Sequence, residues 1–194
     1  PVPLLLGLDA GTTSFKAAIF DEAGRLVAQA SEEYALATPA PDRVEFDPEE
    51  YLRILCRVVR DAVGRSGAAV GSIAALALSS QGETLITVDA DGRALGPAIV
   101  WLDNRSRAEA EIIAGELGTG AAYETTGQPE VVATWPATKV LWLRRNEPDR
   151  FARTARFLLL EDYLLFRLGG RHAGERSLHR SEEHTSDLQS RITI

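Results

Sequence analysis

The chain contains a single cysteine, no methionine and no long apolar run. With Cys56 alone, an internal disulfide framework is excluded, as is usual in a reducing compartment. No stretch approaches the roughly 20 apolar residues that cross a bilayer. The short run 3–8 has no basic flank and is interrupted by Asp9, so it does not resemble a signal peptide. We therefore expect a cytoplasmic protein without a membrane partner.

Basic clusters are also missing. The 21 Lys and Arg residues are outnumbered by 28 Asp and Glu, which gives a net charge of −7. This balance argues against binding to nucleic acids or to anionic membranes. The 194 residues, 45% hydrophobic and 25% charged, suffice for one sizeable core. A small neutral or weakly polar ligand fits this composition better than a charged polymer.

The pattern of apolar segments predicts an α/β fold. Three short strands at 4–8, 16–20 and 26–34 follow one another without an intervening helix, which predicts an antiparallel meander rather than a βαβ unit. Asp47 and Pro48 are typical of a helix start, and Leu52, Leu55, Val59 and Val63 predict its apolar face. Further predicted segments alternate between strand and helix, with residues 37–46 as an extended loop.

The first candidate site is the segment 9–16, between two predicted strands. Asp9 at a strand end can hold Mg²⁺, while Gly11 allows close backbone approach to a ligand. The hydroxyls of Thr12 and Thr13 and the cation of Lys16 suit phosphate oxygens. The segment matches neither a P-loop nor a dinucleotide-binding loop. The alternative is a hairpin turn whose polar groups only satisfy the backbone.

The second candidate site follows a predicted buried strand that ends near residue 79. Gln81, Gly82 and Glu83 combine an amide and a carboxylate beside a glycine, a set that can recognise hydroxyl groups. A polar turn between two strands is the alternative.

Two more segments carry groups that can grip a polyol. Trp101 and Asp103 lie in a run that also holds an amide and a guanidinium group. The alternative is that Asp103 or Asn104 caps the following helix while Arg105 is exposed. Farther along, Trp135 either covers a substrate or anchors a helix.

The order of these motifs is typical of one family. The run LGLDAGTTSFKAAIFDEAG (6–24) resembles the first phosphate segment of the actin, Hsp70 and sugar-kinase fold. SSQGETLITVDADGRALGPAIVWLDNR (79–105) resembles the sugar-side segment of FGGY carbohydrate kinases such as xylulokinase and glycerol kinase. Residues 137–170 resemble that family's next block. The resemblance implies the N-terminal lobe of a ribonuclease H-like kinase, a mixed five-stranded sheet with flanking helices.

The resemblance also implies roles for individual residues. ATP and Mg²⁺ would be the cofactors and a sugar or polyol the substrate, with γ-phosphoryl transfer to a substrate hydroxyl. The implied ATP-phosphate residues are Asp9, Gly11, Thr12, Thr13 and Lys16, with Asp9 near the metal, and the implied substrate residues are Gln81, Gly82, Glu83, Trp101, Asp103 and Trp135. Gly82 replaces the arginine of glycerol kinases, and Ser80-Gln81 replaces the Met-His pair typical of xylulokinases, so neither substrate is singled out.

No residue here matches the family's catalytic aspartate, which the resemblance places well beyond position 180. We therefore expect a truncated N-terminal domain over 1–179, inactive by itself, from a full-length parent that is a homodimer. Residues 180–194 resemble the translation of a sequencing adapter, and we interpret them as a non-native tail. The alternative functions are an ATPase switch of the same superfold and a non-catalytic sugar-binding fragment.

Overall fold

The computed structural model describes residues 3–118 and 120–170, so the predicted non-native tail lies outside the described part. The chain divides into two compact units. The first unit comprises Pro1–Leu36 and Asp47–Gln81, and the second comprises Ala37–Phe46 and Gly82–Ile194. Each unit has its own sheet, and the two are described separately below.

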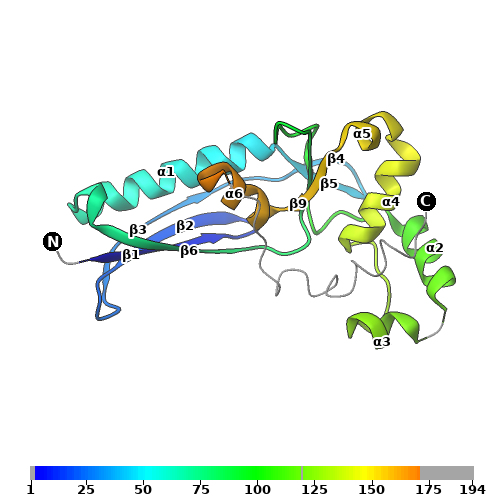
Figure 1. Ribbon diagram of the computed structural model, residues 1–194, viewed down its shortest axis with the longest axis horizontal. Coiled ribbons are helices and arrows are strands. Elements are labelled where there is room, and N and C mark those ends of the chain that lie inside the picture. The colour runs from blue at the N-terminus through cyan, green and yellow to red at the C-terminus, as the bar shows by residue number, and fades with distance from the viewer. Residues whose placement is uncertain (1–2, 119, 171–194) are drawn as a thin grey trace. The chain divides into compact units, whose positions relative to one another are not determined.

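The first unit is built on a four-stranded mixed sheet. Its strand order is β3-β2-β1-β6, with bounds β1 (Leu4–Ala10), β2 (Ser14–Phe20), β3 (Leu26–Glu33) and β6 (Ile73–Ser80). The first three strands form the predicted antiparallel meander, and β6 pairs with β1 in parallel. Helix α1 (Pro48–Ser66) runs along one face of this sheet (Figure 1). A short 3₁₀ turn, η1 (Val70–Ser72), leads into β6.

The core of the first unit lies between α1 and the sheet. Alternate residues of β2, namely Phe15, Ala17 and Ile19, are fully buried, as the period of two along a strand requires. Helix α1 covers them with a buried stripe: Tyr51, Ile54, Leu55, Val58 and Ala62. The predicted stripe shared only Leu55 with this set, because the helix is rotated so that Tyr51 packs flat against Phe15.

The predicted start of α1 is confirmed. Asp47 adopts an extended conformation, and its carboxylate accepts a hydrogen bond of 2.9 Å from the backbone N–H of Glu49. Pro48 occupies the first turn, where its missing N–H costs nothing. The helix ends at Gly67, whose φ of 64° is readily adopted only without a side chain.

The second unit contains a five-stranded antiparallel sheet of order β4-β5-β8-β7-β9. Its strands are β4 (Ala37–Ala40), β5 (Arg43–Phe46), β7 (Leu85–Val88), β8 (Ala98–Ile99) and β9 (Arg156–Leu159). The prediction of an extended loop over 37–46 is therefore wrong. These residues form a hairpin, since the backbone of β5 finds partners in β8, a strand about 50 residues later in the sequence.

Helices of the second unit pack around this sheet. They are α2 (Arg107–Leu117), α3 (Ala121–Thr126), α4 (Pro136–Asn146), α5 (Pro148–Arg153) and α6 (Leu160–Gly169). A buried apolar cluster of Leu85, Ile99, Trp142 and Leu143 joins α4 to the sheet. No helix in the described part of the chain is long and apolar enough to cross a membrane.

The predicted α/β class is confirmed, but the strands are distributed differently from the single mixed five-stranded sheet that was expected. Among the described residues the mixed sheet has four strands, and the strands after Gln81 pair with the hairpin of β4 and β5 instead. In the hairpin, the backbone of β5 pairs with that of β8.

Candidate phosphate and polyol sites

The turn between β1 and β2 forms a tightly closed loop. The N–H of Gly11 donates to the carbonyl of Ser14 over 3.1 Å, and the N–H of Tyr34 donates to the carbonyl of Thr13 over 3.1 Å. A Cβ at Gly11 would lie 3.0 Å from the Ser14 carbonyl oxygen. Glycine at this position therefore avoids a tight contact within the turn itself.

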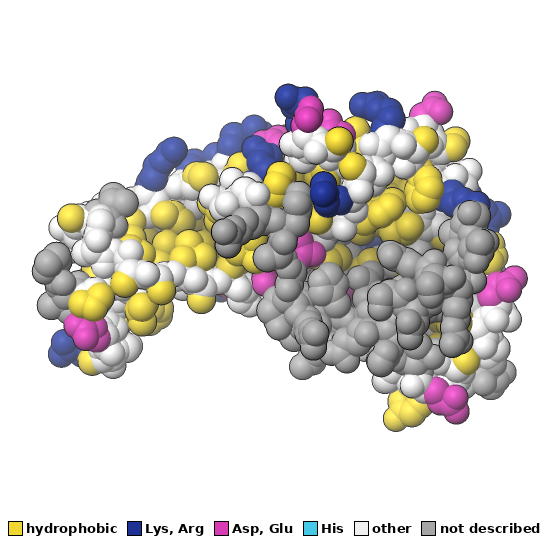
Figure 2. Space-filling view, viewed as in Figure 1, with side chains coloured by type: hydrophobic (Ala, Val, Ile, Leu, Met, Phe, Trp, Pro, Cys, Tyr) yellow, Lys and Arg dark blue, Asp and Glu magenta, His cyan; other side chains and the backbone are white. Residues whose placement is uncertain are grey.

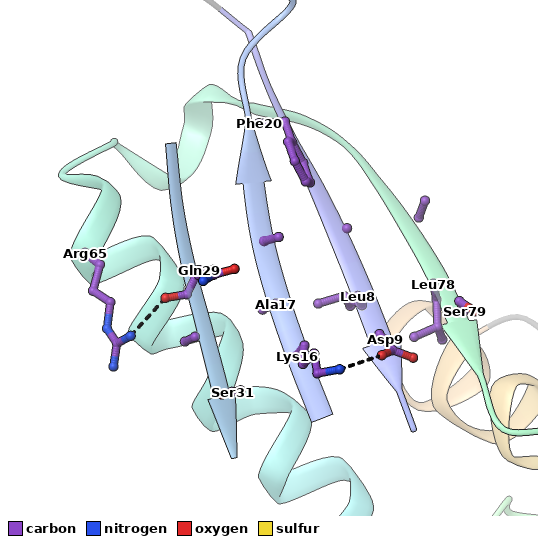
Figure 3. Close-up of a pocket in the computed structure, with 14 residues that line it drawn as sticks. Leu8, Asp9, Lys16, Ala17, Phe20, Gln29, Ser31, Arg65, Leu78 and Ser79 are labelled. Carbon is purple, nitrogen blue, oxygen red and sulfur yellow. Dashed lines mark hydrogen bonds and ion pairs between the residues drawn. The ribbon is translucent and has the colours of Figure 1, made fainter. Parts of the chain in front are cut away.

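Asp9 and Lys16 face each other across the end of the loop. They are register partners on β1 and β2, and the Lys16 Nζ lies 3.6 Å from the Asp9 Oδ2 (Figure 3). Their side chains are 49% and 60% exposed, so both charges are accessible to a ligand. A loose, solvated pair of this kind contributes little to stability, which leaves both groups available for binding.

The Asp9–Lys16 pair opens onto a pocket of about 610 Å³ on the sheet face of the first unit. Its apolar lining includes Ala18, Phe20 and Ala77, and Ser79 of β6 lies near Asp9 (Figure 3). Figure 2 shows hydrophobic side chains gathered over this sheet, while Lys and Arg side chains follow α1. Polar side chains lie on more than one side of the pocket, because Gln29, Ser31 and Arg65 line it in addition to Asp9, Lys16 and Ser79 (Figure 3).

Asp9 is suited to a magnesium ion that arrives with a nucleotide. Mg²⁺ is usually held by one or two carboxylates, with phosphate oxygens and water completing the octahedron. Within residues 3–118 and 120–170, no group of three or more His, Cys, Asp or Glu side chains is placed to hold a metal. An accessible single carboxylate beside a lysine fits an ion bound mainly by phosphates, and it does not fit a resident metal centre.

Gln81 lies beneath this same loop in the first unit. Its N–H donates to the Ala10 carbonyl over 3.0 Å, and its Oε1 accepts from the Thr12 hydroxyl over 3.5 Å. Its Nε2 donates to the hydroxyls of Tyr34 and Tyr51 over 3.3 and 3.5 Å. Gln81 was predicted among the substrate residues, but both ends of its amide contact the phosphate-loop side.

Two tyrosines that the sequence analysis did not single out support the loop. The Tyr34 hydroxyl donates to the Gly11 carbonyl over 2.6 Å, and Tyr34, Tyr51 and Phe15 form an aromatic cluster. Burial raises the pKa of Tyr34 to about 12, with hydrogen bonds from Tyr51 and Gln81 opposing this and the charge of Asp9 adding to it. Burial also raises the pKa of Tyr51. Both hydroxyls are therefore protonated donors at neutral pH. No local motif marked them, since they lie 23 and 40 residues beyond Gly11.

Glu83 begins the second unit in an unusual backbone conformation. Its φ of 60° is the only positive value outside glycine among the described residues, and its side chain is half-buried. The carbonyl of Glu83 accepts a hydrogen bond of 3.0 Å from the Nζ of Lys139, a residue of α4. A non-glycine residue in the left-handed region costs about 1–2 kcal/mol, so the surrounding structure must enforce it.

Asp103 is fully buried in a network of charges. Its Oδ2 accepts from the Val44 N–H over 2.6 Å and from the Arg105 Nη2 over 2.8 Å, while its Oδ1 accepts from the Arg105 Nε over 2.9 Å. Arg105 also pairs with Glu45 over 2.6 Å, and its guanidinium group lies 4.9 Å from the centre of the Trp142 ring. The alternative with a helix cap and an exposed Arg105 is wrong, because Ser106 precedes α2 and Arg105 is only 7% exposed.

The two predicted tryptophans differ in accessibility. Trp101 is half-buried. Its backbone N–H donates to the Thr84 hydroxyl over 3.2 Å, which joins it to the segment of Glu83. Trp135 is 4% exposed and begins α4, where its carbonyl accepts from the Thr138 hydroxyl over 2.8 Å. Trp135 therefore matches the alternative of a helix anchor. Gly82 has open space where a Cβ would stand.

Sequence comparison finds relatives among sugar and polyol kinases. A glycerol kinase of Aromatoleum aromaticum is 36% identical over 171 residues, which cover 86% of this chain and 34% of the relative. A xylulose kinase of Staphylococcus xylosus is 28% identical over 166 residues, again covering 86% of this chain and 34% of the relative. The chain thus spans about a third of the length of the curated relatives that it matches.

Structural comparison agrees with the sequence relatives. A gluconate kinase from Lactobacillus acidophilus is 26% identical, with a TM-score of 0.85 over 93% of this chain and 36% of that chain. This likeness confirms the predicted actin, Hsp70 and sugar-kinase superfold. A profile of the FGGY family of carbohydrate kinases, N-terminal domain, matches residues 4–191. The chain belongs to the FGGY family of carbohydrate kinases and corresponds to its N-terminal domain.

Proposed function

We propose that this chain provides the phosphate-side and polyol-side residues of an ATP-dependent kinase that transfers the γ-phosphoryl group to a hydroxyl of a small sugar or polyol. The observation that carries the proposal is the accessible Asp9–Lys16 pair. The pair flanks the turn at Gly11, which is closed by a backbone hydrogen bond from Gly11 to Ser14. Opposite charges that remain solvated and unsaturated are what a metal-bound triphosphate requires.

On the phosphate side, each group has a distinct role in the proposal. Asp9 contacts Mg²⁺ directly or through a water molecule, and Lys16 neutralises β- and γ-phosphate oxygens. The N–H groups and hydroxyls of Thr12 and Thr13 face the phosphates, while Gly11 permits their approach. The bound Mg²⁺ would supply charge neutralisation for the transferred group. Gln81 is assigned to this side, because it supports the loop through Thr12 and Tyr34.

On the polyol side, we assign direct contact to Glu83 and Trp101. The Glu83 carboxylate can accept two hydroxyl hydrogen bonds, and the Trp101 ring offers an apolar face for the carbon chain. Gly82 leaves space for the ligand beside Glu83. Asp103 and Trp135 are buried, so we assign them to supporting the site rather than to contacting the substrate.

The proposal assigns no catalytic base to the described residues. A base must lie within hydrogen-bond reach of the hydroxyl that it activates. The carboxylate oxygens of Asp103 are occupied by Arg105 and Val44, and Glu83 is assigned to binding. The transfer therefore rests here on positioning and charge neutralisation, which supply most of the catalysis in phosphoryl transfer.

Nuclear magnetic resonance on the ¹⁵N-labelled 194-residue chain tests this proposal. Titration with glycerol, D-xylulose and D-gluconate should shift the Glu83 amide and the Trp101 indole resonances, while MgATP should shift those of residues 9–16. Glu83→Gln should weaken the polyol response alone, and Asp9→Asn should weaken the MgATP response alone. If no polyol perturbs the second unit at any concentration, or if both ligands shift the same residues, the proposed division of roles is wrong.

A further inference from the structure

Lys139 is a buried cation whose role no motif indicated. It is 0% exposed, although it is one of only two lysines in the chain. Its Nζ donates to two backbone carbonyls, that of Glu83 over 3.0 Å and that of Val100 over 3.1 Å. Removing an ammonium group from water is costly, and a methionine of similar volume would fill the same space without that cost. The charge is therefore better explained by the two carbonyls that it holds.

Those two carbonyls belong to the two segments that we assign to polyol binding. Glu83 is held at a φ of 60°, a conformation that its own side chain disfavours. Val100 immediately precedes Trp101, and the backbone N–H of Trp101 donates a hydrogen bond to the Thr84 hydroxyl. A single ammonium group thus links the backbone of Glu83 to the backbone that carries Trp101. Residues in strained conformations persist only where neighbouring contacts over-determine them.

We propose that Lys139 is a positioning residue for the polyol: its ammonium group fixes the Glu83 and Val100 carbonyls, and thereby the relative placement of the Glu83 carboxylate and the Trp101 ring. The inference rests on the proposed function for its substrate, but its structural part can be tested alone. Lys139 contacts no substrate atom in this arrangement, so it acts through Glu83 and Trp101.

The electrostatic surroundings of Lys139 make its charge adjustable by pH. Burial lowers its pKa to about 8, the charges of Glu83 and Asp103 oppose this change, and Arg105 adds to it. Near pH 8 the group passes from an ammonium ion to a weaker neutral donor. A residue that only fills space would not transmit this titration to the Glu83 and Val100 carbonyls.

The first experiment needs no substitution and no ligand. In the 194-residue chain labelled with ¹³C and ¹⁵N, the Lys139 side chain and the carbonyl carbons of Glu83 and Val100 should titrate with one common midpoint. The carbonyl carbons of β7 should not follow it. If the two carbonyl resonances stay constant while Lys139 titrates, the proposed linkage is wrong.

The second experiment compares Lys139→Met and Lys139→Arg with Arg144→Met, a change to a half-buried cation on the same helix. Lys139→Met should move the Glu83 amide and carbonyl resonances and weaken glycerol binding about tenfold. Lys139→Arg should restore part of the affinity and abolish its dependence on pH near 8. Arg144→Met should change neither.

The outcomes separate the inference from the proposed function. A folded Lys139→Met chain with unchanged Glu83 resonances overturns the inference, whatever its affinity for glycerol. A further outcome is that the carbonyls titrate with Lys139 while the unsubstituted chain binds none of glycerol, D-xylulose and D-gluconate. In that case Lys139 still fixes the two carbonyls, but the assignment of the substrate, and with it the role of Lys139 in polyol binding, is wrong. Both the inference and the proposed function are supported by two results together. The two carbonyls titrate with Lys139, and the affinity for glycerol falls as the pH rises through 8 in the unsubstituted chain but stays constant in Lys139→Arg.

Discussion

At the scale of single residues, the charged groups of the second unit differ in burial. Glu83 is half-buried, whereas Asp103, Arg105 and Lys139 are enclosed. The sequence offered Glu83 and Asp103 as equivalent candidates. Burial distinguishes them, because a carboxylate whose oxygens already accept four hydrogen bonds has little capacity left for substrate hydroxyls.

The backbone strain at Glu83 predicts an unusual order of stabilities. Glu83→Gly should be more stable than Glu83→Ala by about 1 kcal/mol, because glycine adopts a φ of 60° without a steric penalty. Both variants lose the carboxylate, so their difference isolates the backbone. Urea unfolding followed by circular dichroism measures it. If the alanine variant proves as stable as the glycine variant, Glu83 does not carry strain.

The buried network predicts a large effect at Asp103. Asp103→Ala should lower the free energy of unfolding by about 3–5 kcal/mol, since it leaves the Arg105 guanidinium group buried with only Glu45 to pair with. Asp91→Ala is a suitable control, because Asp91 also pairs with an arginine two residues further on, Arg93, but its side chain is 69% exposed. Its loss should be much smaller. Comparable losses in the two variants would contradict a structural role for Asp103.

At the scale of elements, α4 differs from the other helices in bringing a titratable cation into the core. Its hydrophobic residues Trp142 and Leu143 join the cluster against β7 and β8, and Lys139 lies one turn earlier on the same side. Helix α4 therefore contacts the sheet through apolar packing, and its Lys139 ammonium group donates hydrogen bonds to the carbonyls of Glu83 and Val100. This combination makes the stability of the second unit depend on pH.

The sign of that dependence follows from the lowered pKa of Lys139. Between about pH 8 and its ordinary value of 10.5, the unfolded chain binds a proton that the native chain has lost. Stability should therefore rise with pH over this range, by about 2 kcal/mol between pH 8 and 10 in the limiting case. Above pH 10 the raised pKa of Tyr34 acts in the opposite direction, because unfolded tyrosines then lose protons that the native protein retains.

Urea unfolding at several pH values between 7 and 10 measures this slope. Lys139→Met should flatten it, whereas Lys16→Met should leave it unchanged, since the Lys16 side chain is 60% exposed. A slope that persists in Lys139→Met would assign the pH dependence to other groups.

At the scale of the whole molecule, the first unit carries the candidate phosphate residues of the β1–β2 turn, and the second unit carries the polyol candidates. Both candidate sites consist of binding groups, and no described residue is assigned as the base. The chain also spans about a third of the length of its kinase relatives. These observations lead to an expectation for activity that differs from the expectation for binding.

We expect the 194-residue chain to bind its ligands without turning them over. In an assay that couples ADP release to NADH oxidation, glycerol, D-xylulose and D-gluconate should give no rate above the substrate-free control. The physical reason is that we assign no residue within 3–118 and 120–170 to deprotonate the substrate hydroxyl. Robust polyol-dependent ADP release would show that one of the described carboxylates acts as the base.

The sequence by itself determined the features that depend on neighbouring residues. The strands around Asp9, the glycine turn and the start of α1 at Asp47 follow from local patterns, and the structure contains each of them. The family also followed from the order of the motifs. The hairpin of β4 and β5 was missed because short segments near prolines become strands only when a partner offers them hydrogen bonds, as the distant β8 does for β5 here.

Only the tertiary structure decided which polar residues are accessible and which are enclosed. Lys139 contacts Glu83 across 56 positions, and Tyr34 and Gln81 meet the loop from distant elements. Such contacts depend on how α4, β3 and β6 pack, and no spacing along the chain encodes them locally. Packing also made Asp103 and Trp135 internal and left Glu83 half-buried, since burial is a property of the whole fold rather than of residue type.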